Sequence, residues 1–281
     1  MGTATVGRLS VPGASIYYEV RGSGPALLLI STGNGDATPF GAMADRLAER
    51  FTVISYDRRG FSRSPLDGPV DDDRRLDDDA DDARRLLEHL GDGPGYVMGT
   101  CSGGIVALAL LQRYPEQVAA MVVHEPPLVS VLPDARRWLD FHDELYTVYR
   151  TEGEEVARPI FRTYAGLDGE TRPPAGFELP EQVLADLLSR LRENQVFWYE
   201  HELLTYPAWQ PDVDALRAAA GRLVLAGGSA SHEHFSCLPN VVLAEQLGIE
   251  LAILPGGHVG HITHPIEYAE TLSRVLGDTG S

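Results

Sequence analysis

The sequence predicts an α/β protein with a mostly parallel, doubly wound sheet and one helical insertion. Short apolar runs recur along the chain, each bounded by Gly, Pro or Asp, as expected for parallel strands buried on both faces. Helical stretches separate these runs, and that alternation builds a parallel sheet. It stops between Pro126 and Ala220, where the pattern is helical throughout. With 281 residues, 43% of them hydrophobic, the chain can bury a full core.

The predicted strands begin with a hairpin. Leu9–Val11 and Ile16–Val20 are joined across a Pro-Gly turn. Six candidates for parallel strands follow in order: Ala26–Ile30, Phe51–Tyr56, Gly95–Met98, Ala120–Val123, Arg222–Ala226 and Ile249–Leu254.

Three helices are predicted between the strands of the first half. They cover Pro39–Arg50, Asp71–Leu90 and Ser102–Tyr114. The second carries an apolar stripe at helical spacing together with many aspartates. We interpret these aspartates as a solvated helix face rather than a metal site. The third helix is apolar on most sides, as a helix packed under a sheet should be.

The interrupted segment is predicted to be a helical lid. Helices are expected at Ala135–Glu152, Glu154–Tyr164 and Glu181–Leu204, and the segment holds most of the aromatic residues. The predicted domains are therefore a core at residues 1–125 and 221–281 and a lid at residues 126–220. Lids of this kind close over substrate and exclude water. We expect the substrate pocket to include Trp138, Phe141 and Trp198, although such aromatics also serve to attach a lid to its core.

Charge and composition exclude several classes of function. The formal charge of −18 argues against nucleic acid or an anionic membrane as a partner. The apolar runs are too short to span a bilayer, and the N-terminus lacks a signal pattern. We expect a cytoplasmic protein that acts on a small molecule, in a compartment that keeps Cys101 and Cys237 reduced.

The strongest local pattern is Gly99-Thr100-Cys101-Ser102-Gly103, which lies between a predicted strand and a predicted helix. It has the form G-x-nucleophile-x-G, in which small residues allow a sharp turn that projects the central side chain above the sheet. The glycines flank Cys101 symmetrically, so Ser102 lies one place too late to be the nucleophile. The alternative is a buried structural cysteine in a tight turn.

His258 is the candidate base. It follows the last predicted strand, from where a histidine can reach the turn and take the proton from Cys101. His261 and His264 follow at three-residue spacing, which suggests a metal site, but no cysteine or carboxylate pattern completes one. We therefore expect neither a metal nor a cofactor.

The candidate acid has two possible positions. An aspartate is usual after the penultimate strand, but the segment there offers only Glu233. Glu125 directly follows the preceding strand, whose end also lies near the nucleophile in this topology. We favour Glu125 over Glu233. The alternative role for Glu125 is a lid hinge that fixes loop backbone. A cysteine needs this third group less than a serine does, because its thiolate forms more readily.

Two backbone amides are expected to form an oxyanion hole. One belongs to Ser102, the residue after the nucleophile. The other belongs to the loop after the first parallel strand, at Gly33 or Asn34. The same loop lacks the Lys-Ser/Thr ending of a phosphate-binding loop.

Together these features resemble the α/β-hydrolase superfamily over nearly the whole chain, lid included. The resemblance lies in the order of the Gly33-Asn34-Gly35 loop, the Tyr56–Ser62 segment, the cysteine turn and Pro255-Gly256-Gly257-His258. It implies the fold, the nucleophile and the base, but it says little about substrate.

A narrower resemblance follows from the cysteine and from a carboxylate placed after the earlier strand. Cysteine-dependent Dieckmann cyclases that form tetramates and pyridones have this fold and size, with aspartate where Glu125 stands here. That resemblance implies cyclisation of an acyl chain released from a carrier thioester, with an acyl or peptidyl carrier protein as partner. Carrier domains are acidic, so docking would need a local patch such as Arg136-Arg137.

Two other functions stay open. The same cysteine–histidine pair suits plain hydrolysis of an ester, a lactone or a thioester. Some proteins of this fold instead hold a ligand under the lid as receptors without catalysis, although the intact Cys101 and His258 argue against that class.

Overall fold

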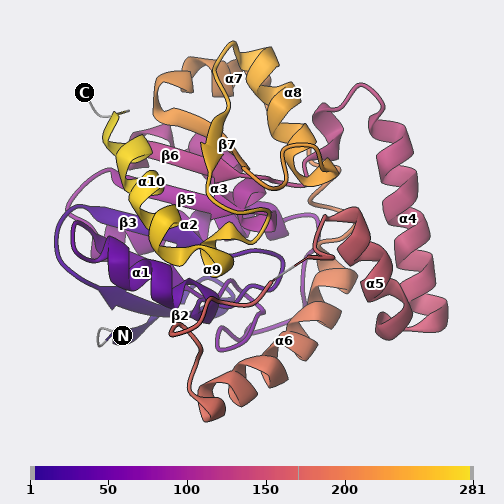
Figure 1. The fold of residues 1–281 in the computed structure, drawn as a ribbon, viewed down its shortest axis with the longest axis horizontal. Coiled ribbons are helices and arrows are strands. Elements are labelled where there is room, and N and C mark those ends of the chain that lie inside the picture. The colour runs from indigo at the N-terminus through magenta and orange to yellow at the C-terminus, as the bar shows by residue number, and fades with distance from the viewer. Residues whose placement is uncertain (1–3, 170, 279–281) are drawn as a thin grey trace.

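The computed structural model describes residues 4–169 and 171–278, and its centre is one twisted sheet (Figure 1). Eight strands lie in the order β1-β2-β4-β3-β5-β6-β7-β8. Their bounds are β1 (Thr5–Val11), β2 (Ala14–Arg21), β3 (Ala26–Ile30), β4 (Thr52–Tyr56), β5 (Gly95–Thr100), β6 (Val118–His124), β7 (Leu223–Gly228) and β8 (Ala252–Leu254).

The strands pair as the alternation predicts. β1 and β2 form an antiparallel hairpin closed at Val11 and Ala14, and β2 joins β4 antiparallel. All pairings from β4 through β8 are parallel. The predicted α/β fold is therefore confirmed. The last strand is shorter than predicted, because Ile249 to Leu251 precede β8.

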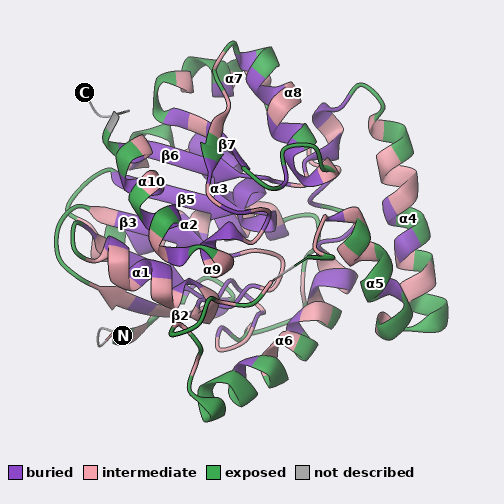
Figure 2. Cartoon of the chain, in the orientation of Figure 1, coloured by how far each residue is buried: buried purple, intermediate pink, exposed green. Residues whose placement is uncertain are grey.

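Helices cover both faces of this sheet. The first half contributes α1 (Gly41–Leu47), α2 (Arg75–Leu90) and α3 (Ser102–Arg113), with short 3₁₀ turns η1 (Thr38–Phe40) and η2 (Pro115–Gln117). The second half contributes η5 (Phe235–Cys237), α8 (Leu238–Leu247), α9 (Gly260–Thr263) and α10 (Pro265–Asp278). One face packs against α1 and α10, and the other against α2, α3 and α8. Figure 2 shows the strands between them buried.

Side-chain alternation along each strand feeds these two cores. In β3, Leu27 and Leu29 pack towards α1 and α10, while Leu28 and Ile30 pack towards α2 and α3. All four are completely buried. A strand that is apolar on both faces is thus stable only at the centre of such a three-layer arrangement.

A helical insertion separates β6 from β7. It contains η3 (Val129–Val131), α4 (Ala135–Glu152), α5 (Glu154–Tyr164), α6 (Glu181–His201), α7 (Val213–Ala218) and η4 (Ala220–Arg222). In Figure 1, α4, α5 and α6 stand together on one side of the sheet. Both ends of the insertion join the main core, through Leu128 and Leu216. The exact division at residues 125/126 and 220/221 stays a prediction, and its outer limits at residues 1 and 281 lie outside the described residues.

The acidic helix α2 corrects one prediction. Asp79 and Asp82 are fully buried rather than solvated. Asp82 accepts hydrogen bonds from Nε and Nη2 of Arg59, each 2.7 Å long. Asp79 lies 3.2 Å from Nη1 of Arg58. The prediction of a solvated face is wrong for these two aspartates. A buried carboxylate requires a positively charged partner, and Arg58 and Arg59, which follow β4, are buried beside them.

No helix within residues 4–169 and 171–278 is long and apolar enough to cross a membrane.

Candidate active site

Cys101 occupies a sharp turn between β5 and α3. Its backbone has φ 54° and ψ −128°, a region that side chains other than glycine rarely adopt. The flanking glycines make the turn possible. A Cβ at Gly99 would lie 2.3 Å from the carbonyl oxygen of Gly103, and a Cβ at Gly103 would lie 2.3 Å from that of Ser31. The sequence pattern therefore produces the sharp strand-to-helix turn that it predicts.

Two backbone amides lower the pKa of the Cys101 thiol and therefore lie beside its sulfur. They belong to Gly33, in the loop after β3, and to Ser102, the first residue of α3. The amide of Asn34 has a different acceptor, Oγ1 of Thr32, at 3.2 Å. Of the two positions that the sequence left open in this loop, the geometry thus favours Gly33.

Glu125 and His258 come together from distant parts of the chain. Nδ1 of His258 lies 2.8 Å from Oε2 of Glu125, and the histidine also hydrogen-bonds to Cys101. Because Nδ1 faces the carboxylate, Nε2 is the ring nitrogen left for the sulfur. Glu125 has φ 46°, a left-handed backbone that turns its side chain back over the strand ends. The three side chains thus form one interacting group.

The loop after β7 supports Glu125 instead of supplying an acid. The amide of Gly228 donates to Oε1 of Glu125 at 2.7 Å, and the hydroxyl of Ser231 donates to the same oxygen. Glu233 points away: its side chain is 87% exposed and lies 3.8 Å from His232. Glu125 is therefore the carboxylate that contacts the histidine, whereas Glu233 does not reach it.

These contacts set the charges of the group. Burial raises the pKa of the Cys101 thiol, but His258 and the two amides outweigh that effect and lower it below its ordinary value. Burial lowers the pKa of His258, but the Cys101 thiolate and Glu125 outweigh it and raise it to about 10. Burial also raises the pKa of the Glu125 carboxyl, yet the hydrogen bond from His258 holds it well below its usual range. The shifts of Cys101 and His258 thus favour transfer of the thiol proton to the imidazole, beside an ionised carboxylate.

The lid covers this group. Cys101 is 7% exposed and His258 is 6% exposed. Trp198 of α6 lies directly against Gly33, and its indole Nε1 donates to the hydroxyl of Ser102 at 3.3 Å. Of the three aromatics predicted to line the pocket, Trp198 is therefore the one that the structure places against the two amide-bearing residues.

An unpaired hydroxyl faces the same region. The Tyr164 hydroxyl at the end of α5 is buried and has no hydrogen-bond partner among the residues that the structure describes. Burial raises its pKa, and the charge of Cys101 raises it further, so the two groups lie within electrostatic reach. Phe141 stacks on Tyr164 at 4.3 Å between ring centroids, and Trp138 packs against it at 5.8 Å. Trp138 and Phe141 thus reach the site through Tyr164, and their contact with substrate stays a prediction.

The two histidines that follow His258 have other surroundings. His261 is buried and packs on Phe40 and Tyr268, while His264 is exposed. Among the described residues, no group of three or more His, Cys, Asp or Glu side chains is arranged to hold a metal ion.

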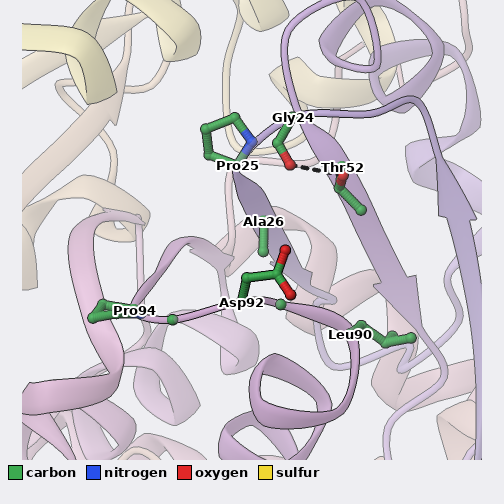
Figure 3. Close-up of a pocket in the computed structure, with 9 residues that line it drawn as sticks. Gly24, Pro25, Ala26, Thr52, Leu90, Asp92 and Pro94 are labelled. Carbon is green, nitrogen blue, oxygen red and sulfur yellow. Dashed lines mark hydrogen bonds between the residues drawn. The ribbon is translucent and has the colours of Figure 1, made fainter.

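One hollow of about 240 Å³ lies elsewhere (Figure 3). It is lined by Gly24 to Ala26, Thr52 and Leu90 to Pro94. These residues lie at or just before the amino-terminal ends of β3, β4 and β5. Cys101 follows the carboxyl-terminal end of β5. Since parallel strands carry their ligands at the carboxyl ends, the hollow lies at the wrong edge of the sheet for catalysis.

The fold and this geometry agree with known proteins. A family model described as the alpha/beta hydrolase fold matches residues 25–167. The chain belongs to the α/β-hydrolase fold family.

Relatives within the α/β-hydrolase family cover almost the whole chain. An uncharacterized hydrolase, YraK, from Bacillus subtilis strain 168 is 37% identical over 98% of this chain and 97% of its own. A zearalenone hydrolase from Bionectria ochroleuca is 25% identical over 93% of this chain and 94% of its own. A thermophilic esterase from Thermogutta terrifontis matches in structure with a TM-score of 0.71 and 19% identity, over 100% of both chains. This last likeness shows the fold alone, and the sequence relatives make the chain a hydrolase of this fold.

Two residues near the site were missed by sequence reasoning. Tyr164 was counted among the lid aromatics but not among the pocket residues, because nothing local distinguishes it from its neighbours. Asn194 of α6 donates to the carbonyl oxygen of Asn34 at 2.6 Å and is almost fully buried. The only sequence signal for Asn194 is its amide side chain within a predicted helix, because a buried amide in a helix requires specific hydrogen-bond partners.

Proposed function

We propose that this protein hydrolyses an ester, a lactone or a thioester through an acyl-enzyme intermediate on Cys101. One arrangement carries the proposal: His258 hydrogen-bonds to Glu125, and His258 lowers the pKa of the Cys101 thiol together with the amides of Gly33 and Ser102. The arrangement matches a nucleophile, its base and a group that orients the base, beside two donors for a developing oxyanion.

The chemistry follows from these positions. The thiolate of Cys101 attacks the substrate carbonyl carbon, a carbon–sulfur bond forms, and the amides of Gly33 and Ser102 bind the oxygen anion. His258 then donates its proton to the departing alcohol or thiol as the carbon–oxygen or carbon–sulfur bond of the substrate breaks. In the second half His258 takes a proton from water, which attacks the thioester. Collapse of the resulting tetrahedral intermediate breaks the carbon–sulfur bond, returns the thiolate–imidazolium pair and releases the carboxylic acid, which loses its proton to solvent.

The substrate class is supported by the lid. The aromatic rings of Trp138, Phe141, Tyr164, Phe161 and Trp198 form one connected series of ring contacts, and Trp198 lies against Gly33, so we take this series as the lining of the substrate region. Such a lining suits an apolar or aromatic acyl group and excludes bulk water from it. A zearalenone hydrolase is among the relatives, which favours hydrolysis and makes esters and lactones the first compounds to test.

Cyclisation of a carrier-bound acyl chain is the second candidate. Cyclisation is supported by the cysteine at the turn between β5 and α3, because a thioester on Cys101 exchanges readily with a thioester donor. The relatives reported above are named hydrolases, so hydrolysis is the stronger proposal. Docking of an acidic carrier also has little support, since the Arg136 and Arg137 side chains are each paired with a neighbouring aspartate.

Product analysis distinguishes these functions. The protein is incubated with an aryl ester, a macrocyclic lactone and a β-ketoacyl-aminoacyl thioester, and intact mass is followed together with released product. We expect an adduct on Cys101 and the free acid as product. A ring one water lighter than the acid would instead support the cyclase. Saturable binding without any adduct or turnover would support the receptor.

A further inference from the structure

We propose that helix α6 of the lid positions the oxyanion loop, and that Asn194 is the central positioning residue. The loop is Thr32–Asp36, which follows β3 and contains Gly33. Because the role of Gly33 depends on the proposed acyl transfer, this inference deepens the proposed function rather than standing apart from it.

One face of α6 carries the residues that contact this loop. Arg190, Asn194 and Trp198 are four residues apart and therefore share one face of α6. Glu202 continues this series directly after the helix end. Each of the four contacts a different part of the oxyanion loop, directly or through one intermediary.

The first half of the face contacts the end of the loop. Nε of Arg190 donates to Oδ2 of Asp36 at 2.7 Å, and that carboxylate is fully buried. Nδ2 of Asn194 donates to the carbonyl oxygen of Asn34 at 2.6 Å. The same amide group spans Ser62, accepting from its backbone N–H at 2.9 Å and donating to its hydroxyl at 2.7 Å.

The second half contacts the start of the loop. Trp198 lies so close to Gly33 that a Cβ there would be 2.6 Å from the indole nitrogen. Glu202 binds Arg58 through two hydrogen bonds of 2.8 and 2.9 Å, and Nη2 of Arg58 donates to the carbonyl oxygen of Thr32 at 2.9 Å. Glu202 and Arg58 are both fully buried.

Successive turns of α6 therefore contact the loop in order, from Asp36 back through Asn34 and Gly33 to Thr32. A backbone amide works as an oxyanion donor only if it is held in place before the reaction. The carbonyl of Thr32, which Arg58 binds, shares its peptide plane with the N–H of Gly33. The carbonyl of Asn34, which Asn194 binds, lies two peptide planes further along, so these contacts limit movement of the loop on both sides of the donor amide. The oxyanion hole is thus complete only when α6 of the lid is packed against this loop.

Asn194→Asp removes the donor to the carbonyl oxygen of Asn34, together with the donor to the hydroxyl of Ser62. The aspartate keeps an acceptor for the amide of Ser62. Glu193→Gln is the matched control, since it exchanges the same two groups at the adjacent, exposed position. Arg190→Gln is a second, milder variant, because Asp36 keeps Arg63 as a partner.

Two reactions of Cys101 are compared in each variant. Acylation by p-nitrophenyl acetate forms an oxyanion, whereas alkylation by iodoacetamide does not. We expect Asn194→Asp to slow acylation about tenfold to a hundredfold, less than or equal to the loss of one oxyanion donor. Alkylation should stay within about twofold, because the thiolate and His258 are untouched. Glu193→Gln should change neither rate, and Arg190→Gln should slow acylation less than Asn194→Asp.

Two outcomes would overturn the inference. Equal acylation in Asn194→Asp and the unaltered protein would show that the loop keeps its position without α6. An equal loss of acylation and alkylation would show general disruption of the site. If the unaltered protein reacts with iodoacetamide but no ester acylates it, the proposed function itself fails, which is a distinct result.

Discussion

Oε2 of Glu125 lies 2.8 Å from Nδ1 of His258, although 133 residues separate them in the chain. Glu125 follows β6, and the loop after β7 supplies two donors to its other oxygen. The carboxylate therefore follows β6 instead of β7, after which an acid is usual in this fold. Residues at that usual position donate hydrogen bonds to Glu125 instead.

Replacement of the nucleophile gives the first prediction. Cys101→Ala should lower ester turnover by at least about three powers of ten and remove the acyl adduct. Ser102→Ala should lower turnover by less than about tenfold, because it loses only the hydroxyl that accepts from Trp198 and keeps its amide. Turnover and intact mass provide the measurement. Retention of the adduct in Cys101→Ala would exclude this cysteine as the nucleophile.

The acid gives the second prediction. Glu125→Gln should lower turnover about tenfold to a hundredfold, because His258 loses the carboxylate that orients it and stabilises its proton. Glu233→Gln, at an exposed position, should change turnover by no more than about twofold. The turnover of both variants is measured, and thermal unfolding checks that they fold. A larger loss of turnover in Glu233→Gln than in Glu125→Gln would show that Glu233 is the acid.

The pH dependence of the ion pair gives the third prediction. Ester turnover should rise with pH as Cys101 loses its proton, at a pH below the ordinary thiol range because the pKa of Cys101 is lowered. It should fall near pH 10, where His258 loses the proton that the leaving group needs. Iodoacetamide alkylation should show only the rising limb, since it needs no proton donor. In Glu125→Gln the falling limb should move to lower pH.

Tyr164 gives the fourth prediction. Tyr164→Phe should stabilise the fold by about 1 kcal/mol or more, because it removes a buried hydroxyl that has no partner. The same change should lower kcat/KM about tenfold if that hydroxyl binds substrate. Tyr199→Phe is the matched control: its hydroxyl is also buried and unpaired, but its ring stacks on Tyr149. It should stabilise without loss of activity. Unchanged activity in Tyr164→Phe would remove this residue from the site.

Buried His261 gives the fifth prediction. Burial lowers its pKa to about 3 in the folded protein, against about 6.5 in the unfolded chain. The unfolded state therefore binds one more proton as pH falls below about 6.5, and stability is lost in that range. His261→Phe should reduce the slope of unfolding free energy against pH by up to ~1.4 kcal/mol per pH unit between about pH 6 and 4. Urea unfolding at several pH values measures it, with exposed His232→Phe as control. An unchanged slope would mean that His261 is protonated in the folded state.

Much of the fold could be predicted from local pattern. The β3 run Ala26–Ile30 and the helices α4 and α5 have the predicted bounds, because apolar periodicity and Gly or Pro boundaries act over a few residues. The turn around Cys101 was equally predictable, since the small residues that allow it are adjacent to it in the chain.

What the sequence by itself determined is therefore short-range: the order of strands and helices, the elbow at Cys101 and the presence of a histidine after the last strand. Only the tertiary structure decided which partners these groups have. It buried Asp79 and Asp82 against arginines, brought Glu125 rather than Glu233 to His258, and placed Asn194 against the loop Thr32–Asp36. The physical reason is that a polar side chain's state depends on the charges and donors packed around it, and those come from segments that only the folded topology brings together.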